Sequence, residues 1–137
     1  MKKQKKFVNM AMILLLIVAI FYLYLENRQI KITSDKLAQS YLADSVKADK
    51  KFKAKKIELT GIVAAIYTTQ DTIMVIRLSS QNEINIYCYA SQNQIKNTDK
   101  FQINDKLIII GECFGMTEFF NLTGVFIKIS SIKTGTS

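Results

Sequence analysis

The sequence contains no histidine, and it has only two cysteines among its 137 residues. Without histidine the chain lacks the commonest general base, the imidazole metal ligand and a side chain that titrates near neutral pH. It also lacks a nucleophile elbow and a phosphate-binding loop. We therefore expect no catalytic activity, no cofactor and no metal site.

The two cysteines, Cys88 and Cys113, are too few for a disulfide framework and have no CxxC spacing. A zinc knuckle and a thioredoxin-like redox motif are thereby excluded. One interpretation is that both thiols are small buried hydrophobic groups. The alternative is one disulfide between them, if the domain lies in an oxidising compartment.

The chain after residue 6 carries only a small excess of positive charge. The net charge is +8, and Lys2, Lys3, Lys5 and Lys6 supply four of these charges. The remaining 15 basic and 11 acidic side chains leave a net charge of +4. This mildly basic balance falls short of the dense lysine and arginine stripe that is typical of nucleic-acid-binding proteins.

Residues 7 to 25 form an apolar run in which Asn9 is the only polar side chain. As a helix these 19 residues reach about 28 Å, close to the thickness of a bilayer core. A cleaved signal peptide is the alternative, but the run ends in Phe21–Leu25 without the small residues that signal peptidase requires. We therefore favour an uncleaved transmembrane anchor. The lysines of residues 1 to 6 place that basic tail in the cytoplasm and the remaining chain outside it.

The rest of the chain is predicted to form one mainly β domain. Residues 26–33 are interpreted as a polar tether, and residues 131–137 as a disordered tail. Ser34 begins an amphipathic helix that runs to about residue 48, and residues 34–130 form the domain. Alternating apolar residues predict five strands, at residues 53–67, 72–79, 84–90, 106–114 and 119–130.

Three predicted strands contain an internal glycine: Gly61, Gly111 and Gly124. The burial pattern changes at Gly61 and again at Gly124. A residue without Cβ at such a change is typical of a bulge or of the corner of a barrel. A tight turn is expected at residues 115–118. The five strands are therefore expected to close into a small barrel.

Residues 47–56 are rich in lysine and precede the first strand. A functional interpretation makes Lys50, Lys51, Lys53, Lys55 and Lys56 a basic patch for phosphates, anionic lipid headgroups or an acidic polymer. The alternative is a solvated connection, which is what most charge runs are.

Three stretches resemble a known family. Residues 48–63 resemble the start of the bacterial OB-fold family labelled tRNA anticodon-binding-domain-like. Residues 86–89 are similar to its third strand, and residues 110–115 to its Gly-x-Cys-x-Gly turn. The resemblance implies a five-stranded Greek-key OB-fold barrel behind a signal, lipid anchor or membrane helix. Many members have a cysteine in the last strand, whereas this chain has Gly124, Val125 and Phe126 there, which would leave Cys88 as the only partner of Cys113.

OB-folds bind ligands along their second and third strands. On the face opposite the predicted core, Arg77, Tyr87 and Tyr89 could form a cation and stacking platform, with Val75 between them and Met116 on a nearby loop. The alternative is that these tyrosines pack against the barrel or the helix.

We consider three functions. The first is a non-catalytic, membrane-tethered, extracytoplasmic binding module for an envelope protein or an oligosaccharide. The second is a single-stranded nucleic-acid-binding module, which requires the domain to face the cytoplasm. The third is a structural adaptor that docks a partner through an exposed barrel edge.

Overall fold

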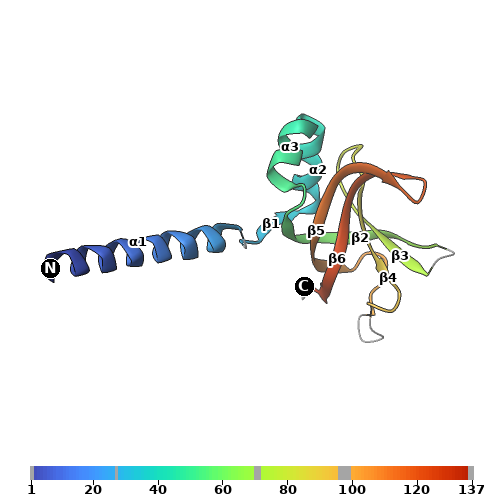
Figure 1. The fold of residues 1–137 in the computed structure, drawn as a ribbon. Helices are drawn as coiled ribbons and strands as arrows, with labels where there is room; N and C mark the ends of the chain where they lie inside the picture. Colours follow the sequence, from blue (N-terminus) through green and yellow to red (C-terminus); the bar gives the residue numbers. More distant parts are fainter. Residues whose placement is uncertain (1, 27, 70–71, 96–99, 136–137) are drawn as a thin grey trace.

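The computed structural model describes residues 2–26, 28–69, 72–95 and 100–135. A long N-terminal helix leads into a small barrel with two short helices at one end (Figure 1). The elements in chain order are α1 (Lys2–Glu26), β1 (Ile30–Thr33), α2 (Ser34–Ala43), α3 (Ser45–Phe52), β2 (Lys56–Thr68), β3 (Ile73–Leu78), β4 (Ile86–Ser91), β5 (Lys106–Phe119) and β6 (Leu122–Thr134).

The sheet has the strand order β1-β2-β3-β4-β6-β5 and closes through a further pairing of β2 with β5. Strand β2 makes this closure possible because it changes partner along its length. Residues 56–62 pair with β5, and residues 63–68 pair with β3. Strands β2 to β6 thus form the five-stranded OB-fold barrel that the sequence predicted, and the predicted fold class is confirmed.

The core fills the inside of the barrel with aliphatic side chains. Alternate residues of each strand point inward, as a half-buried strand requires. Helices α2 and α3 cover one end, where Tyr41 and Phe52 pack with ring centroids 6.5 Å apart. The largest fully buried side chains include Phe52, Leu37, Ile57, Leu59, Ile76, Leu78, Ile86, Leu107, Ile109 and Ile127.

Helix α1 contacts none of this core, and its described side chains are exposed from Lys3 to Leu25. It is long and apolar enough to cross a membrane. A secretion signal passes the same test of length and composition.

The predicted tether contains a strand. Residues Ile30–Thr33 form β1, which pairs in parallel with β2 so that Ile30 lies opposite Ile57 and Thr33 opposite Thr60. Ile30 and Ile32 alternate and pack against the core, which explains why this stretch pairs with the sheet. Lys31, between them, lies 3.9 Å from Glu58.

The single helix predicted from Ser34 to about residue 48 is wrong, because the chain forms two helices that meet at Asp44. This residue is extended, with φ −163°, and its carboxylate accepts a hydrogen bond from the Lys47 backbone N–H. Asp44 therefore caps the start of α3, as Thr33 caps the start of α2.

The three glycines lie where another group comes too close for a Cβ. A Cβ at Gly61 would lie 2.8 Å from the Ser34 hydroxyl, one at Gly111 2.2 Å from the Lys128 carbonyl oxygen, and one at Gly124 2.4 Å from the Asn85 carbonyl oxygen. The register of β5 against β6 shifts at Gly111, whereas the shift in β2 comes two residues after Gly61.

The turn expected at residues 115–118 is also wrong. Gly115, with φ +78°, lies beside a register shift within β5, and the strand continues to Phe119. The reversal is the two-residue turn Phe120–Asn121, where both residues have positive φ as in a type I′ hairpin. At the other end, β6 extends to Thr134, so only residues 136 and 137 of the predicted tail lie outside the described residues.

Candidate ligand-binding face

The outside of β3, β4 and β6 carries aligned side chains, which we call the outer face. One cross-strand row is Tyr67, Val75, Tyr89, Lys128 and Glu112. The next row is Ala65, Arg77, Tyr87, Phe126 and Gly115. Both rows follow from the period of two along β2, β3, β4 and β6. In β5 a register shift between Cys113 and Gly115 makes the step three residues. Four of the five predicted platform residues thus share one face: Val75, Arg77, Tyr87 and Tyr89.

A cluster of aromatic rings occupies this face. The Tyr87 and Phe126 rings stack with centroids 5.2 Å apart, and the Phe119 ring meets Phe126 edge-on at the same distance. Tyr89 lies within 6.3 Å of the rings of Phe114, Phe119, Phe120 and Phe126. Tilted and edge-on pairs of this kind are favourable ring geometries. The hairpin of β5 and β6 therefore folds its tip over the outer face (Figure 1).

The predicted residues differ in how far a ligand could reach them. Val75 is fully buried and Tyr87 is only 5% exposed, so both pack as the alternative interpretation proposed. Tyr89 and Arg77 are half-buried. Met116 packs against the barrel core, on the other side of the sheet, and does not join the platform.

Arg77 is the unusual polar group of the outer face. Its Nε atom is buried and has no hydrogen-bond partner among the described residues. Burial and the neighbouring Tyr67 raise the pKa of the Tyr87 hydroxyl, while the positive charge of Arg77 acts in the opposite direction. Arg77 therefore lies beside Tyr87, its cross-strand neighbour. The buried Nε is closed to solvent, so a ligand oxygen could accept only from a guanidinium nitrogen that solvent reaches.

Sequence reasoning missed the most accessible rings of the outer face. Tyr67, Phe119 and Phe120 are each 39% exposed and border the outer face. Tyr67 lies directly opposite Val75 because β2 shifts register between Val63 and Ala65. The signal for Phe119 and Phe120 was a pair of aromatics followed by Asn121, but locating the turn at residues 115–118 concealed it.

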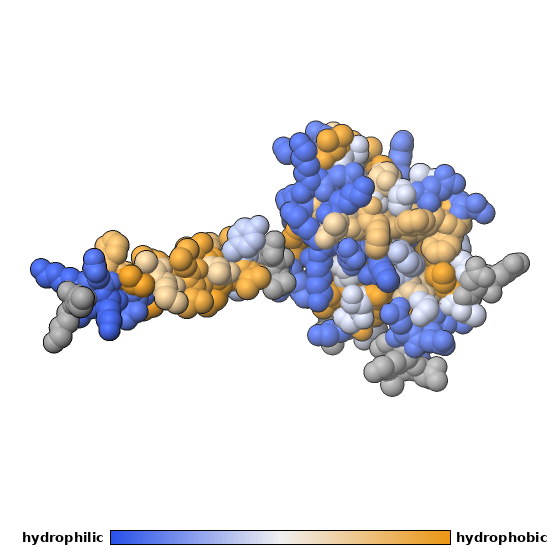
Figure 2. Space-filling view, in the orientation of Figure 1, coloured by the Kyte–Doolittle hydropathy of each residue, from blue (hydrophilic) through white to orange (hydrophobic). Residues whose placement is uncertain are grey.

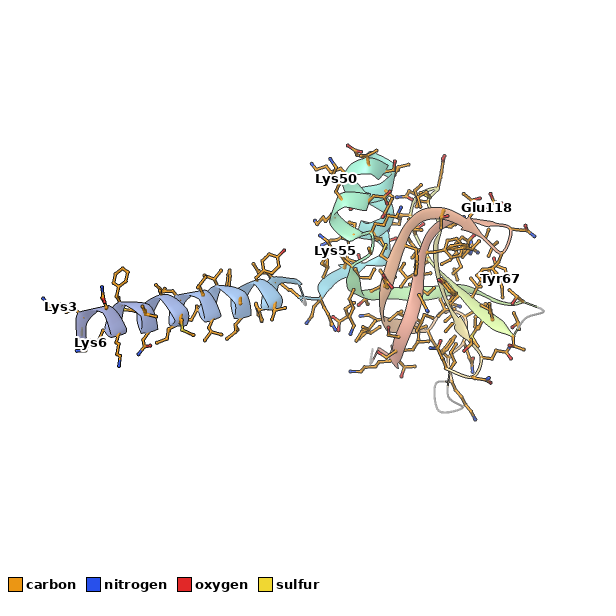
Figure 3. The ribbon with its side chains drawn as sticks, in the orientation of Figure 1. Lys3, Lys6, Lys50, Lys55, Tyr67 and Glu118 are labelled. Atoms are coloured by element: carbon orange, nitrogen blue, oxygen red, sulfur yellow. The ribbon has the colours of Figure 1, made fainter. Side chains whose placement is uncertain are left out.

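The basic patch candidates lie elsewhere. Lys50 and Lys51 occupy the last turn of α3, Lys53 caps it, and Lys55 and Lys56 lead into β2; all five are exposed. Figure 3 shows Lys50 and Lys55 on the edge of the domain where α1 joins, and Tyr67 and Glu118 toward the opposite edge. Lys50 and Lys55 therefore lie away from Tyr67, whereas Lys56 pairs with Glu112 at the edge of the outer face.

Cys88 and Cys113 are both free and buried. Both pair with Ile127 of β6, which lies between them. Two strand spacings separate their Cα atoms by roughly 9–10 Å, beyond the limit of about 7 Å for a disulfide. Both thiols are free in this structure, and the barrel would have to distort to join them in a disulfide.

Burial raises the pKa of both thiols. Cys113 also lies 3.9 Å from the hydroxyl of Tyr41, which donates a 2.9 Å hydrogen bond to Asp49. This buried group joins α2, α3 and β5. In the described part of the chain no three His, Cys, Asp or Glu side chains gather as a metal site would require.

A pocket of about 270 Å³ contains none of the platform residues in its lining, and Ala90, Ile95 and Ile129 contribute to its wall. Its described lining residues carry no charge. The described lining therefore provides no charged side chain that could bind an ionic group of a ligand.

Solved structures with a similar fold include a putative aspartyl-tRNA synthetase from Leishmania major Friedlin, at 9% identity and a TM-score of 0.53. The match covers 77% of this chain and 20% of the synthetase. The telomere capping protein Ten1 from Saccharomyces pombe aligns at 11% identity over 78% of this chain and 81% of its own, with a TM-score of 0.46. An OBody bound to hen egg-white lysozyme aligns at 17% identity over 61% and 84%, with a TM-score of 0.49.

At 9% identity, the similarity to the synthetase concerns the fold alone. No curated protein matches the chain. The family model named tRNA_anti-like matches residues 1–124, which is most of the sequence, and its expected barrel is the one observed. The chain therefore belongs to the tRNA_anti-like family of OB-fold proteins.

Proposed function

We propose that this chain is a non-catalytic, membrane-tethered module that binds a ligand on its outer face, outside the cytoplasm. The observation that carries the proposal is Arg77, a half-buried cation with no ion pair among the described residues, on a face bordered by partly exposed rings. A charged donor beside stacking surfaces suits a ligand that has rings and acceptor oxygens.

The charge of the outer face favours a compact ligand over a long polyanion. Arg77 and Lys128 are the cations of its two cross-strand rows, and Glu112 lies opposite Lys128. A nucleic acid that runs along a protein groove needs a series of cations for its phosphates. An oligosaccharide needs only rings to stack on and a few hydrogen-bond donors, which this face offers.

The anchor and its direction are part of the proposal. The exposed apolar surface of α1 supports insertion into a bilayer, and the four lysines of residues 1–6 favour a cytoplasmic N-terminus. A reporter enzyme that is active only outside the cytoplasm, fused after Ser137, should be active. Activity of a cytoplasm-specific reporter at the same position would contradict the proposal.

A second candidate is single-stranded nucleic-acid binding, favoured by the family and by similarity to a protein described as an aspartyl-tRNA synthetase. Stacking on Phe120, Phe119 or Tyr67 would supply about 1–3 kcal/mol per base. Titration with a single-stranded oligothymidylate at two salt concentrations tests it. Tight, strongly salt-dependent binding together with a cytoplasmic domain would establish this candidate, and no binding would remove it.

A further inference from the structure

The lysine run forms an exposed corner of the domain, which we call the lysine corner: Lys50, Lys51, Lys53, Lys55 and Lys56. The described residues contain one ion pair, Lys31 with Glu58, so none of these five lysines is neutralised by a carboxylate within 4 Å. Lys51 lies over the Phe52 ring, 5.3 Å from its centroid, with its side chain otherwise open to solvent. Lys56 lies opposite Glu112 at the edge of the outer face, and the proposed ligand contacts do not involve the charge of this corner.

Strand β1 fixes where this corner lies relative to α1. It begins at Ile30, four residues after the helix ends at Glu26, so the chain can span at most about 14 Å between them. Ile30 pairs with Ile57, directly after Lys55 and Lys56. Adjacent strands lie about 4.8 Å apart. The domain is therefore attached to its helix at the lysine corner rather than by a free linker.

We propose that the lysine corner contacts the anionic lipid headgroups of the membrane in which α1 is anchored. The inference rests on the proposed anchor. Hydrophilic residues line the edge of the domain next to α1 in Figure 2, and Lys50 and Lys55 lie on that edge in Figure 3. Exposed lysines held this close to a bilayer gain from anionic lipid, about fivefold in affinity for each lysine.

This contact fixes how the domain is presented. With the lysine corner on the lipid surface, Tyr67 and Glu118 lie toward the far edge of the domain, away from the membrane (Figure 3). The outer face is then open to ligands in the surrounding compartment. The charge therefore orients the module, and the aromatic rings bind.

The test uses the full chain in lipid nanodiscs of phosphatidylcholine alone or mixed with phosphatidylglycerol. Each lysine is labelled with an amine-reactive reagent and quantified by mass spectrometry. We expect labelling of Lys55 and Lys56 to fall about fivefold or more in the anionic discs, and to recover at high salt. Lys128, which is exposed on the outer face and is expected to remain open to solvent, should label equally in both discs.

Three results would overturn parts of the proposal. Equal labelling of the lysine corner in both lipids, in a chain retained in the discs, refutes the lipid contact and leaves the anchor intact. Failure of the chain to remain in the discs refutes the anchor itself. Protection by added soluble polyphosphate in neutral discs, with none from phosphatidylglycerol, would assign the corner to an anionic polymer instead.

Discussion

The two faces of one sheet have different chemistry. The inner face is aliphatic and closed, with side chains such as Leu59, Ile109 and Ile127 fully buried. The outer face is aromatic, and the exposed fraction of its rings ranges from 0% for Phe126 to 39% for Phe120. If the sheet served only to build a barrel, we would expect the side chains on its outer face to be polar. The exposed rings, together with an Arg77 Nε that has no hydrogen-bond partner among the described residues, are the reason why we propose the outer face as the ligand-binding surface.

The largest effect on stability is expected at the inner face. Phe52 is fully buried where α3 meets the barrel, and Phe52→Ala leaves a cavity under both helices. We expect a loss of about 3–5 kcal/mol in the free energy of unfolding. Urea denaturation followed by circular dichroism measures it, and a loss below about 1 kcal/mol would show that the helices are not part of the core.

A smaller loss is expected from the buried part of the outer face. Tyr87→Ala removes a ring that is 5% exposed and stacks on Phe126. We expect a loss of about 2–3 kcal/mol, measured by the same denaturation. Tyr87→Phe, the matched control, keeps the stack and should lie within about 1 kcal/mol of the natural protein. If Tyr87→Ala lowered the free energy of unfolding no more than Tyr87→Phe does, the aromatic cluster of the outer face would contribute no packing energy.

Alkaline pH should weaken the domain through its thiols. The pKa of Cys88 and of Cys113 is raised in the folded chain, mainly by burial, so stability is complete below the unfolded pKa of about 8.5 and falls above it. Each thiol contributes a slope of up to about 1.4 kcal/mol per pH unit. Urea denaturation at several pH values should show a shallower slope for Cys88→Ala. An unchanged slope would mean that Cys88 ionises equally in both states.

The smallest effect on stability belongs to the exposed turn. Phe120 has φ 55°, a conformation that costs a bulky residue about 1–2 kcal/mol and a glycine almost nothing. Phe120→Gly should therefore change stability by less than about 1 kcal/mol, yet weaken ligand binding. Asn121→Gly, with φ 61° at the replaced residue, is the control that keeps the rings. Equal binding by both variants would show that Phe120 takes no part in the site.

The strands, the barrel and the two sides of β3 and β4 could be predicted because alternation along a strand reports burial directly. Strand β1 could not, since Ile30–Thr33 is too short to reveal a period before its partner is known. The break at Asp44 had a local signal, an acidic residue able to cap α3, but the apolar spacing across it suggested one continuous helix.

The candidate site was predictable only in part. Arg77 and Tyr89 followed from the parity of their strands, whereas the exposed rings depend on a register shift in β2 and on a turn without glycine. Both features are set by packing between distant segments. The distance between Cys88 and Cys113 likewise depends on which strand lies between them.

The most direct test of the outer face is a matched titration of the natural chain, Arg77→Gln and the control Lys106→Gln. Tyrosine fluorescence reports binding, because the chain has six tyrosines and no tryptophan. The probes are a chitin oligosaccharide and a single-stranded oligothymidylate. We predict that the oligosaccharide binds, that Arg77→Gln weakens it about tenfold or more, and that Lys106→Gln does not. Binding that survives Arg77→Gln, or no binding of either probe to the natural chain, would contradict the account.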